Sequence, residues 1–191
     1  MTKSRMEAFS DGVIAVIITI LVLELRVPHE PTLAALVPVA PVFLSYVLSF
    51  VFLGIYWSNH HHLLQAVKHV DGRVLWANLH LLFWLSLIPF VTGWVGENHF
   101  AARPVALYGV VLLFASIAYF ILARLLVSLH GSDSVIAIAL GRDFKGRVST
   151  VIYLVAIPLA FFKSWLAFAF YVLVAAMWLV PDRRIERTIV Q

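Results

Sequence analysis

The sequence has no cysteine and few charged residues. The absence of cysteine excludes disulfide bonds, thiol nucleophiles and cysteine-ligated metal or haem sites. Only 13% of the 191 residues are charged, whereas about a quarter of the residues in a soluble domain are charged. Hydrophobic residues make up 62% of the chain, and its mean hydropathy is +0.96. This composition is typical of an integral membrane protein and excludes an ordinary soluble domain.

The few charges that are present are biased toward the positive, with a net charge of +4. In a soluble protein this bias would suggest a nucleic-acid partner, but in a membrane protein it usually reflects Lys and Arg in cytoplasmic loops. We therefore expect the chain to contact a lipid bilayer and no nucleic acid. The apolar run after Gly12 has no small-x-small cleavage site and Arg26 follows it directly, so we expect a mature helix rather than a signal peptide.

Six apolar runs predict six transmembrane helices, because one span needs about 20 mostly apolar residues. We expect them at about 5–26, 34–67, 73–95, 104–129, 147–162 and 164–181. The predicted fold class is an all-α integral membrane protein, with residues 1–191 forming a single six-helix transmembrane domain. The second helix is long for one span, so its end near Lys68 is expected to project into water. The last two helices are joined only by the residues FKS and should form a tight antiparallel hairpin.

The distribution of Lys and Arg predicts that both termini face the cytoplasm, because short cytoplasmic loops are enriched in these residues. With the N-terminus inside, 11 of the 14 basic residues lie in inside segments: Lys3, Arg5, Lys68, Arg73, Arg124, Arg142, Lys145, Arg147, Arg183, Arg184 and Arg187. The three in outside segments are Arg26, Arg103 and Lys163. The opposite orientation would reverse this strong asymmetry.

One stripe of the first helix has heptad spacing and carries small, β-branched and medium-sized side chains. Its members are Gly12, Val16, Thr19, Leu23 and Arg26, with Val13, Ile20 and Val27 beside them. One interpretation is a packed seam between helices. The other is a pore wall, because rings of apolar side chains around a symmetry axis can filter or gate ions by narrowing and dewetting.

Polar residues on the first three helices are expected at one depth, about 10 Å from the cytoplasmic ends of these helices. An ionisable group in hydrocarbon is costly unless it is paired or hydrated, and buried polar groups in a bundle must satisfy one another. We therefore predict a buried network. Its expected members are Arg5, Ser10, Asp11, Trp57 (an indole donor), His60, His61 and Asn78. Alternatively, Arg5 is an interfacial anchor and Asp11 a first-turn acid that favours the helix dipole.

The three successive histidines do not have the spacing of a metal site. They point about 100° apart, so at most two of His60, His61 and His62 can meet the same partner. Helical ligand pairs need i, i+4 spacing, and no two histidines of this chain have it. The sequence also lacks a nucleophile–base pair with helical spacing. We therefore expect neither a metal site, nor a cofactor, nor an enzyme.

Two motifs link the chain to a known family. The opening run RMEAFSDGVIAVIITILVLEL contains Arg-x-x-x-Phe-Ser-Asp, at Arg5, Phe9, Ser10 and Asp11. The segment YWSNHHHLL contains Trp-x-x-His-His, at Trp57, His60 and His61, and NLHLLFWLSLIPF follows from Asn78. These segments resemble the bacterial branch of the transmembrane protein 175 (endolysosomal potassium channel) family. The motif match covers about the first 90 residues, and the rest of the chain matches only in hydropathy.

This resemblance implies a potassium-permeable cation channel in the bacterial inner (plasma) membrane, built as a homotetramer. The first helix of each subunit would line a central pore, and its apolar rings would replace a carbonyl filter such as Thr-Val-Gly-Tyr-Gly, which the sequence lacks. Counting from the Phe-Ser-Asp motif, the implied constriction residues are Val16, Thr19, Ile20 and Leu23. Potassium ions would be the permeant partner, and the polar network would pack helices around the pore.

One residue of the implied constriction departs from the family pattern. Val16 is smaller than the isoleucine or leucine expected at this place. A wider ring would weaken selectivity, or it would make Ile20 or Leu23 the narrowest point. The alternative function is a proton-coupled ion transporter, in which Asp11 and the cluster His60–His62 relay protons.

Overall fold

The computed structural model describes residues 2–131, 134, 136–137 and 144–179. Within these ranges, every regular element is a helix. The elements are α1 (Lys3–Leu23), the 3-10 helix η1 (Leu33–Val39), α2 (Ala40–Gln65), α3 (Gly72–Ser86), α4 (Ile88–Glu97), α5 (Ala102–His130), α7 (Phe144–Leu159) and α8 (Ser164–Leu179). The predicted sixth helix extended to residue 181, and its last two residues lie outside the described part.

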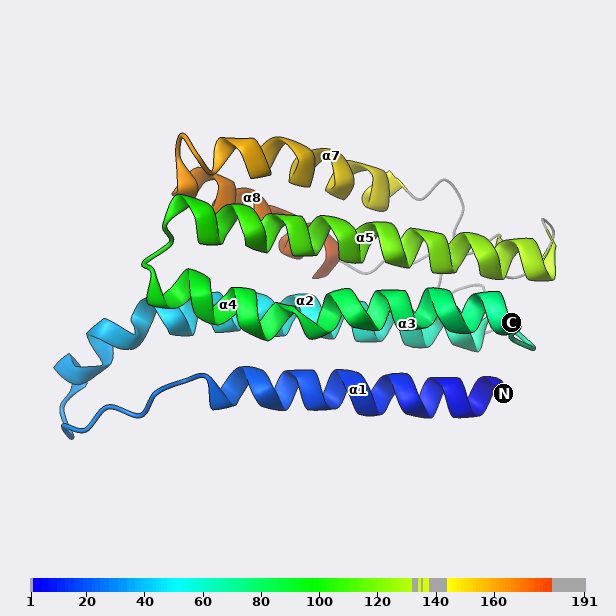
Figure 1. The fold of residues 1–191 in the computed structure, drawn as a ribbon, viewed down its shortest axis with the longest axis horizontal. Coiled ribbons are helices and arrows are strands. Elements are labelled where there is room, and N and C mark those ends of the chain that lie inside the picture. Colours follow the sequence, from blue (N-terminus) through cyan, green and yellow to red (C-terminus); the bar gives the residue numbers. More distant parts are fainter. Residues whose placement is uncertain (1, 132–133, 135, 138–143, 180–191) are drawn as a thin grey trace.

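The helices run side by side in one bundle (Figure 1). The long helix α5 lies in the middle and packs against α3 and α4 on one side and against α7 and α8 on the other. Helix α1 lies at one edge of the bundle, where it contacts α2, α3 and α4. The starts of α1, α3 and α7 and the end of α5 lie together at one end of the bundle.

Close contacts with α5 fix the second half of the bundle. Gly109 of α5 faces the phenol ring of Tyr171 of α8, and a Cβ at Gly109 would collide with the Tyr171 hydroxyl. The Tyr171 hydroxyl donates a hydrogen bond to the Val105 carbonyl (3.3 Å). The glycine therefore allows two helices to approach each other closely, as small residues do in membrane bundles.

The second predicted helix is divided by proline. Pro38 lies inside η1, and Pro41 occupies the first turn of α2. Proline lacks a backbone N–H and clashes with the preceding helical turn, so an α-helix cannot run unbroken through this segment. The part of the predicted helix that exceeds one membrane span therefore lies in the tighter 3-10 helix η1, at the Leu33 end. At its other end the helix was expected to finish at about residue 67, and α2 ends at Gln65. That this end projects into water stays a prediction.

The third predicted helix is also divided, into α3 and α4, which lie end to end in Figure 1. The break is at Leu87, and Pro89 in the first turn of α4 explains it. At its other end, α3 begins after Asp71, whose carboxylate accepts a hydrogen bond from the Val74 backbone N–H (2.9 Å). This hydrogen bond and the neighbouring Arg73 lower the pKa of Asp71 below its ordinary value.

Four helical segments are long and apolar enough to cross a membrane, by length and composition. They are Lys3–Leu23, Leu33–Gln65, Gly72–Glu97 and Ala102–His130. Helices α7 and α8 are apolar but have only 16 residues each in the described part of the chain. This length corresponds to about 24 Å, which is less than the roughly 30 Å of a bilayer core.

Candidate functional site

Helix α1 has one face that packs against the bundle. Its buried residues recur at intervals of three or four: Met6, Ser10, Ile14, Ile17 and Leu21. This spacing places them on one side of a helix, and that side faces α2, α3 and α4. The packed face therefore includes a single hydroxyl and otherwise only apolar side chains.

The opposite face of α1 is uncovered. It includes all four residues that the sequence implied as a constriction: Val16, Thr19, Ile20 and Leu23 are exposed, at 56% for Val16 and 80% for Leu23. Thr19 lies almost directly opposite the packed face, since each residue advances the helix by about 100°. No charged residue occurs between Asp11 and Glu24. The uncovered face is therefore a stripe of apolar side chains with one hydroxyl.

The Thr19 hydroxyl is oriented by its own helix. It donates a hydrogen bond to the Val16 carbonyl oxygen (2.8 Å). A hydroxyl has one proton and two acceptor lone pairs, so its proton is engaged while its oxygen remains an acceptor. In this rotamer, Thr19 offers an oxygen ligand to a cation and offers no hydrogen-bond donor to an anion.

A chain of buried hydrogen bonds joins the first three helices near the start of α1. Asn78 of α3 donates to the Ser10 hydroxyl (2.9 Å), and Ser10 donates to the Met6 carbonyl (2.8 Å). On its other side, the Asn78 carbonyl oxygen lies 2.7 Å from His60 Nε2, which must be the donor of this pair. All three side chains of this Ser10–Asn78–His60 chain are at most 1% exposed. The hydrogen bonds fix both the depth and the rotation of α1 against α2 and α3.

A second group of polar contacts lies at the border of the uncovered face. The Trp57 indole donates to an Asp11 carboxylate oxygen (3.1 Å). His61 Nδ1 lies 3.2 Å from a Glu7 carboxylate oxygen, and its Nε2 lies 2.8 Å from Gln65 Nε2. These side chains are partly or largely exposed, unlike the buried chain. The structure thus arranges the expected polar residues in two groups rather than in one network.

Arg5 lies outside both groups. Its side chain is exposed, and within the described ranges its guanidinium forms no ion pair or hydrogen bond. Arg5 precedes Ser10 by five residues, which turns the two side chains to different sides of the helix. The interfacial interpretation of Arg5 agrees with this geometry better than membership of a buried network does.

Two polar features were missed in the sequence. The first is Glu7, which lies four residues before Asp11 and therefore near it on the helix. The second is a buried hydroxyl cluster in the other half of the bundle, where Ser49 Oγ lies 2.6 Å from Thr92 Oγ1 and 2.9 Å from the Tyr108 hydroxyl. Isolated hydroxyl residues within long apolar runs were the available signal.

Among the described residues, no group of three or more His, Asp or Glu side chains could hold a metal ion.

The apolar helices of this bundle define a multi-pass membrane protein, and comparison with known proteins gives its family. The sequence model of the family described as "Endosomal/lysosomal potassium channel TMEM175" matches residues 5–89. A potassium channel of Chryseobacterium sp. (strain P1-3) is 52% identical over 99% of this chain and 98% of its own length. The chain therefore belongs to the TMEM175 family of potassium channels, which confirms the predicted resemblance.

More distant relatives agree with this assignment. The crystal structure of a lysosomal potassium-selective channel TMEM175 homolog from Chamaesiphon minutus matches with a TM-score of 0.80 and 28% identity, over 93% of this chain and 96% of that one. The human protein named endosomal/lysosomal proton channel TMEM175 is 36% identical over 54% of this chain and 23% of its own length. These relatives are ion channels rather than enzymes, as predicted for this chain.

Proposed function

We propose that this chain forms a homotetrameric, potassium-permeable cation channel, with α1 of each subunit at a central axis. The uncovered stripe of α1 is the observation that carries this proposal. It is apolar, it lies opposite a tightly packed face, and it has no charged residue that would hold an ion too strongly. Four copies facing an axis would form successive rings at Val16, Thr19, Ile20 and Leu23.

In this arrangement, apolar rings would limit passage by their width and by dewetting. The Thr19 oxygens would replace part of the hydration shell of a potassium ion, since their protons are engaged with the Val16 carbonyls. No metal or cofactor takes part, and potassium is the permeant ion. Because Val16 is small, Ile20 and Leu23 are candidates for the narrowest ring.

The same proposal includes six membrane crossings in a single domain, with both termini on the cytoplasmic side of a bacterial inner membrane. The ends of the bundle support it, because α1, α3 and α7 start at one end, and α5 ends there. The basic residues Lys68, Arg73 and Arg147 flank these ends, as the positive-inside rule requires. If α7 and α8 are no longer than their described 16 residues, they would cross by local thinning of the bilayer.

Single-cysteine variants test the pore directly, since the chain has no native cysteine. In liposomes, a cationic thiol reagent should block potassium flux through Leu23→Cys. Leu33→Cys is the matched control, because Leu33 has a similar exposure (86% against 80%) but lies in η1, away from the stripe. It should react without loss of flux. Equal block, or no block of either variant, would contradict the assignment of the stripe as the pore.

A polar substitution tests selectivity. Val16→Asn should change the potassium-to-sodium permeability ratio severalfold, because an amide ring would hydrate the constriction. Val151→Asn on α7 is the control, since Val151 is exposed to a similar extent (60% against 56%) on another helix. An unchanged ratio in Val16→Asn would remove Val16 from the filter.

A proton-coupled ion transporter is the second candidate. The Glu7–His61 contact and the exposed side of Asp11 favour it, because ionisable groups inside a membrane often mark proton pathways. Vertebrate relatives are also named proton channels. In this case a pH gradient should drive potassium flux, and Asp11→Asn should abolish the coupling. If potassium flux depends only on the potassium gradient, both in the wild-type protein and in Asp11→Asn, the result supports the channel.

A further inference from the structure

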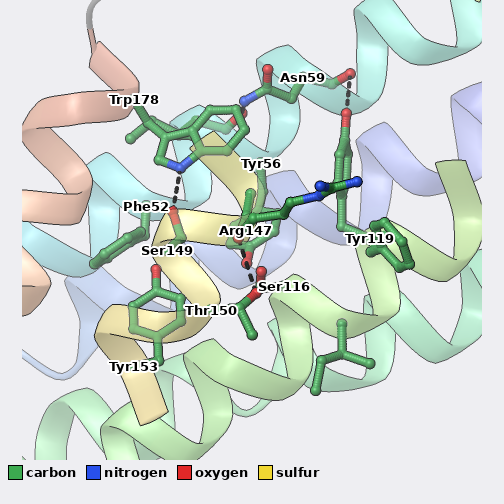
Figure 2. Close-up of a pocket in the computed structure, with 14 residues that line it drawn as sticks. Phe52, Tyr56, Asn59, Ser116, Tyr119, Arg147, Ser149, Thr150, Tyr153 and Trp178 are labelled. Atoms are coloured by element: carbon green, nitrogen blue, oxygen red, sulfur yellow. Dashed lines mark hydrogen bonds between the residues drawn. The ribbon is translucent and has the colours of Figure 1, made fainter. Parts of the chain in front are cut away.

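A cavity of about 370 Å³ opens between α2, α5, α7 and α8, far from the uncovered stripe of α1. Its volume falls in the range of small-molecule sites, roughly 300–1,000 Å³. Figure 2 shows side chains from these four helices around it, with the Trp178 indole donating to Ser149 (2.9 Å) and the Tyr119 hydroxyl donating to the Asn59 carbonyl (3.3 Å). Neither the uncovered stripe nor the Ser10–Asn78–His60 chain includes any residue of this cavity.

The described lining of the cavity carries a positive charge. None of the 14 described residues that line it is acidic, and Arg147 is the only basic residue among them. The Arg147 side chain is exposed and reaches across the cavity toward Tyr119 (Figure 2). Its guanidinium forms no ion pair or hydrogen bond in the described part of the chain. An arginine in this state has its donors available for an anionic oxygen.

The cavity changes from polar to apolar with depth. Arg147 lies in the first turn of α7, whereas Tyr153 lies about 9 Å further along this helix. Helix α2 runs antiparallel to α7. Asn59 lies nearer the polar end of the cavity, and Phe52, seven residues earlier in α2, lies nearer its apolar end. Trp178, near the end of α8, lies at the polar end, where membrane proteins place tryptophan at the lipid interface. An occupant therefore needs an anionic group at the surface of the bilayer and an apolar body within it.

We propose that this cavity binds an anionic phospholipid, with its phosphate on Arg147 and the upper part of an acyl chain between Phe52, Ile117 and Phe120. A soluble anion would leave the apolar part of the cavity unfilled, and a zwitterionic lipid carries a cation that Arg147 repels. The site requires only that the bundle spans a bilayer, so it does not depend on where the pore lies.

Native mass spectrometry of the purified full-length protein tests this proposal. The probes are phosphatidylglycerol and phosphatidylcholine with identical acyl chains, and inorganic phosphate as a competitor. The wild-type protein should bind phosphatidylglycerol at least about fivefold more tightly, the effect of one interfacial basic residue. Arg147→Gln should abolish this preference and Arg147→Lys should retain most of it. Ile117→Trp, which fills the cavity, should reduce the number of bound lipids of both kinds.

Arg73→Gln is the matched control, because it removes a basic residue at the same end of the bundle but outside the cavity. It should keep the preference for phosphatidylglycerol. The proposal is overturned if Arg147→Gln binds both lipids as the wild type does, or if Arg73→Gln loses the preference to the same extent. Displacement of the lipid by millimolar inorganic phosphate would also overturn it, because the site would then recognise a soluble anion.

Discussion

The two faces of α1 are almost equally apolar but differ completely in their surroundings. On the packed face, Ile17 is 3% exposed, whereas Ile20, three residues later, is 40% exposed. The packed face is held by the rest of its own subunit. The uncovered face is largely exposed in the described part of the chain, so in a membrane it faces lipid, another subunit or a pore. The comparison predicts that the stability of the subunit depends on one side of α1, and the proposed assembly and permeation on the other.

The largest expected effect comes from making the same substitution, isoleucine to alanine, on each of the two faces. Ile17→Ala should lower the free energy of unfolding by about 2–5 kcal/mol, because it leaves a cavity among packed side chains. Ile20→Ala should change it by less than about 0.5 kcal/mol, while it alters the potassium-to-sodium permeability ratio. Thermal unfolding in detergent and flux in liposomes measure the two quantities. Equal destabilisation of both variants would contradict this, because Ile20 would then be as tightly packed as Ile17.

The second prediction concerns the buried chain of hydrogen bonds on the packed face. Asn78→Ala should cost about 1–3 kcal/mol, because it leaves the Ser10 hydroxyl and His60 Nε2 buried without their shared partner. Asn59→Ala is the control, since among the described residues the Asn59 side chain donates only to a carbonyl of its own helix. A similar melting temperature for both variants would mean that the buried chain does not fix α1 in the bundle.

The smallest effect is expected at the border between the two faces. Trp57→Phe removes the indole donor to Asp11 but keeps an aromatic ring at this position. Because the contact is exposed, its loss should change stability by at most about 1 kcal/mol. A loss comparable to that of Asn78→Ala, measured under the same conditions, would place Asp11 in the same energetic unit as the buried chain.

Much of the fold was predictable from hydrophobicity. The predicted starts and ends of α1 and α5 lie within three residues of those in the structure, because long apolar runs end at polar loop residues. The division of the second and third helices was not predicted, although Pro38 and Pro89 were visible. Proline is tolerated within membrane helices and at first turns, so its presence alone does not locate a break.

The polar residues show the same limit. Counting residues from the helix ends predicted that Ser10, His60 and Asn78 lie at one depth, and the structure joins these side chains by hydrogen bonds. The counting did not separate them from Asp11 and His61, and it added Arg5. Depth follows from the rise per residue, but choice of partner depends on the rotation of each helix, which neighbouring helices determine. The role of Val16, Thr19, Ile20 and Leu23 in a constriction stays a prediction.

By itself, the sequence determined that this chain lies in a membrane, where its longest helices run and that Ser10, His60 and Asn78 lie at one level. These properties follow from composition and from the fixed rise of a helix. Only the tertiary structure decided which side of α1 remains uncovered. Between Gly12 and Leu23 the helix is apolar on nearly all sides, so its hydrophobicity favours no direction. Close packing of Ile14 and Ile17 and the hydrogen bond from Asn78 to Ser10 select one rotation, and this leaves Val16, Thr19 and Leu23 facing outward.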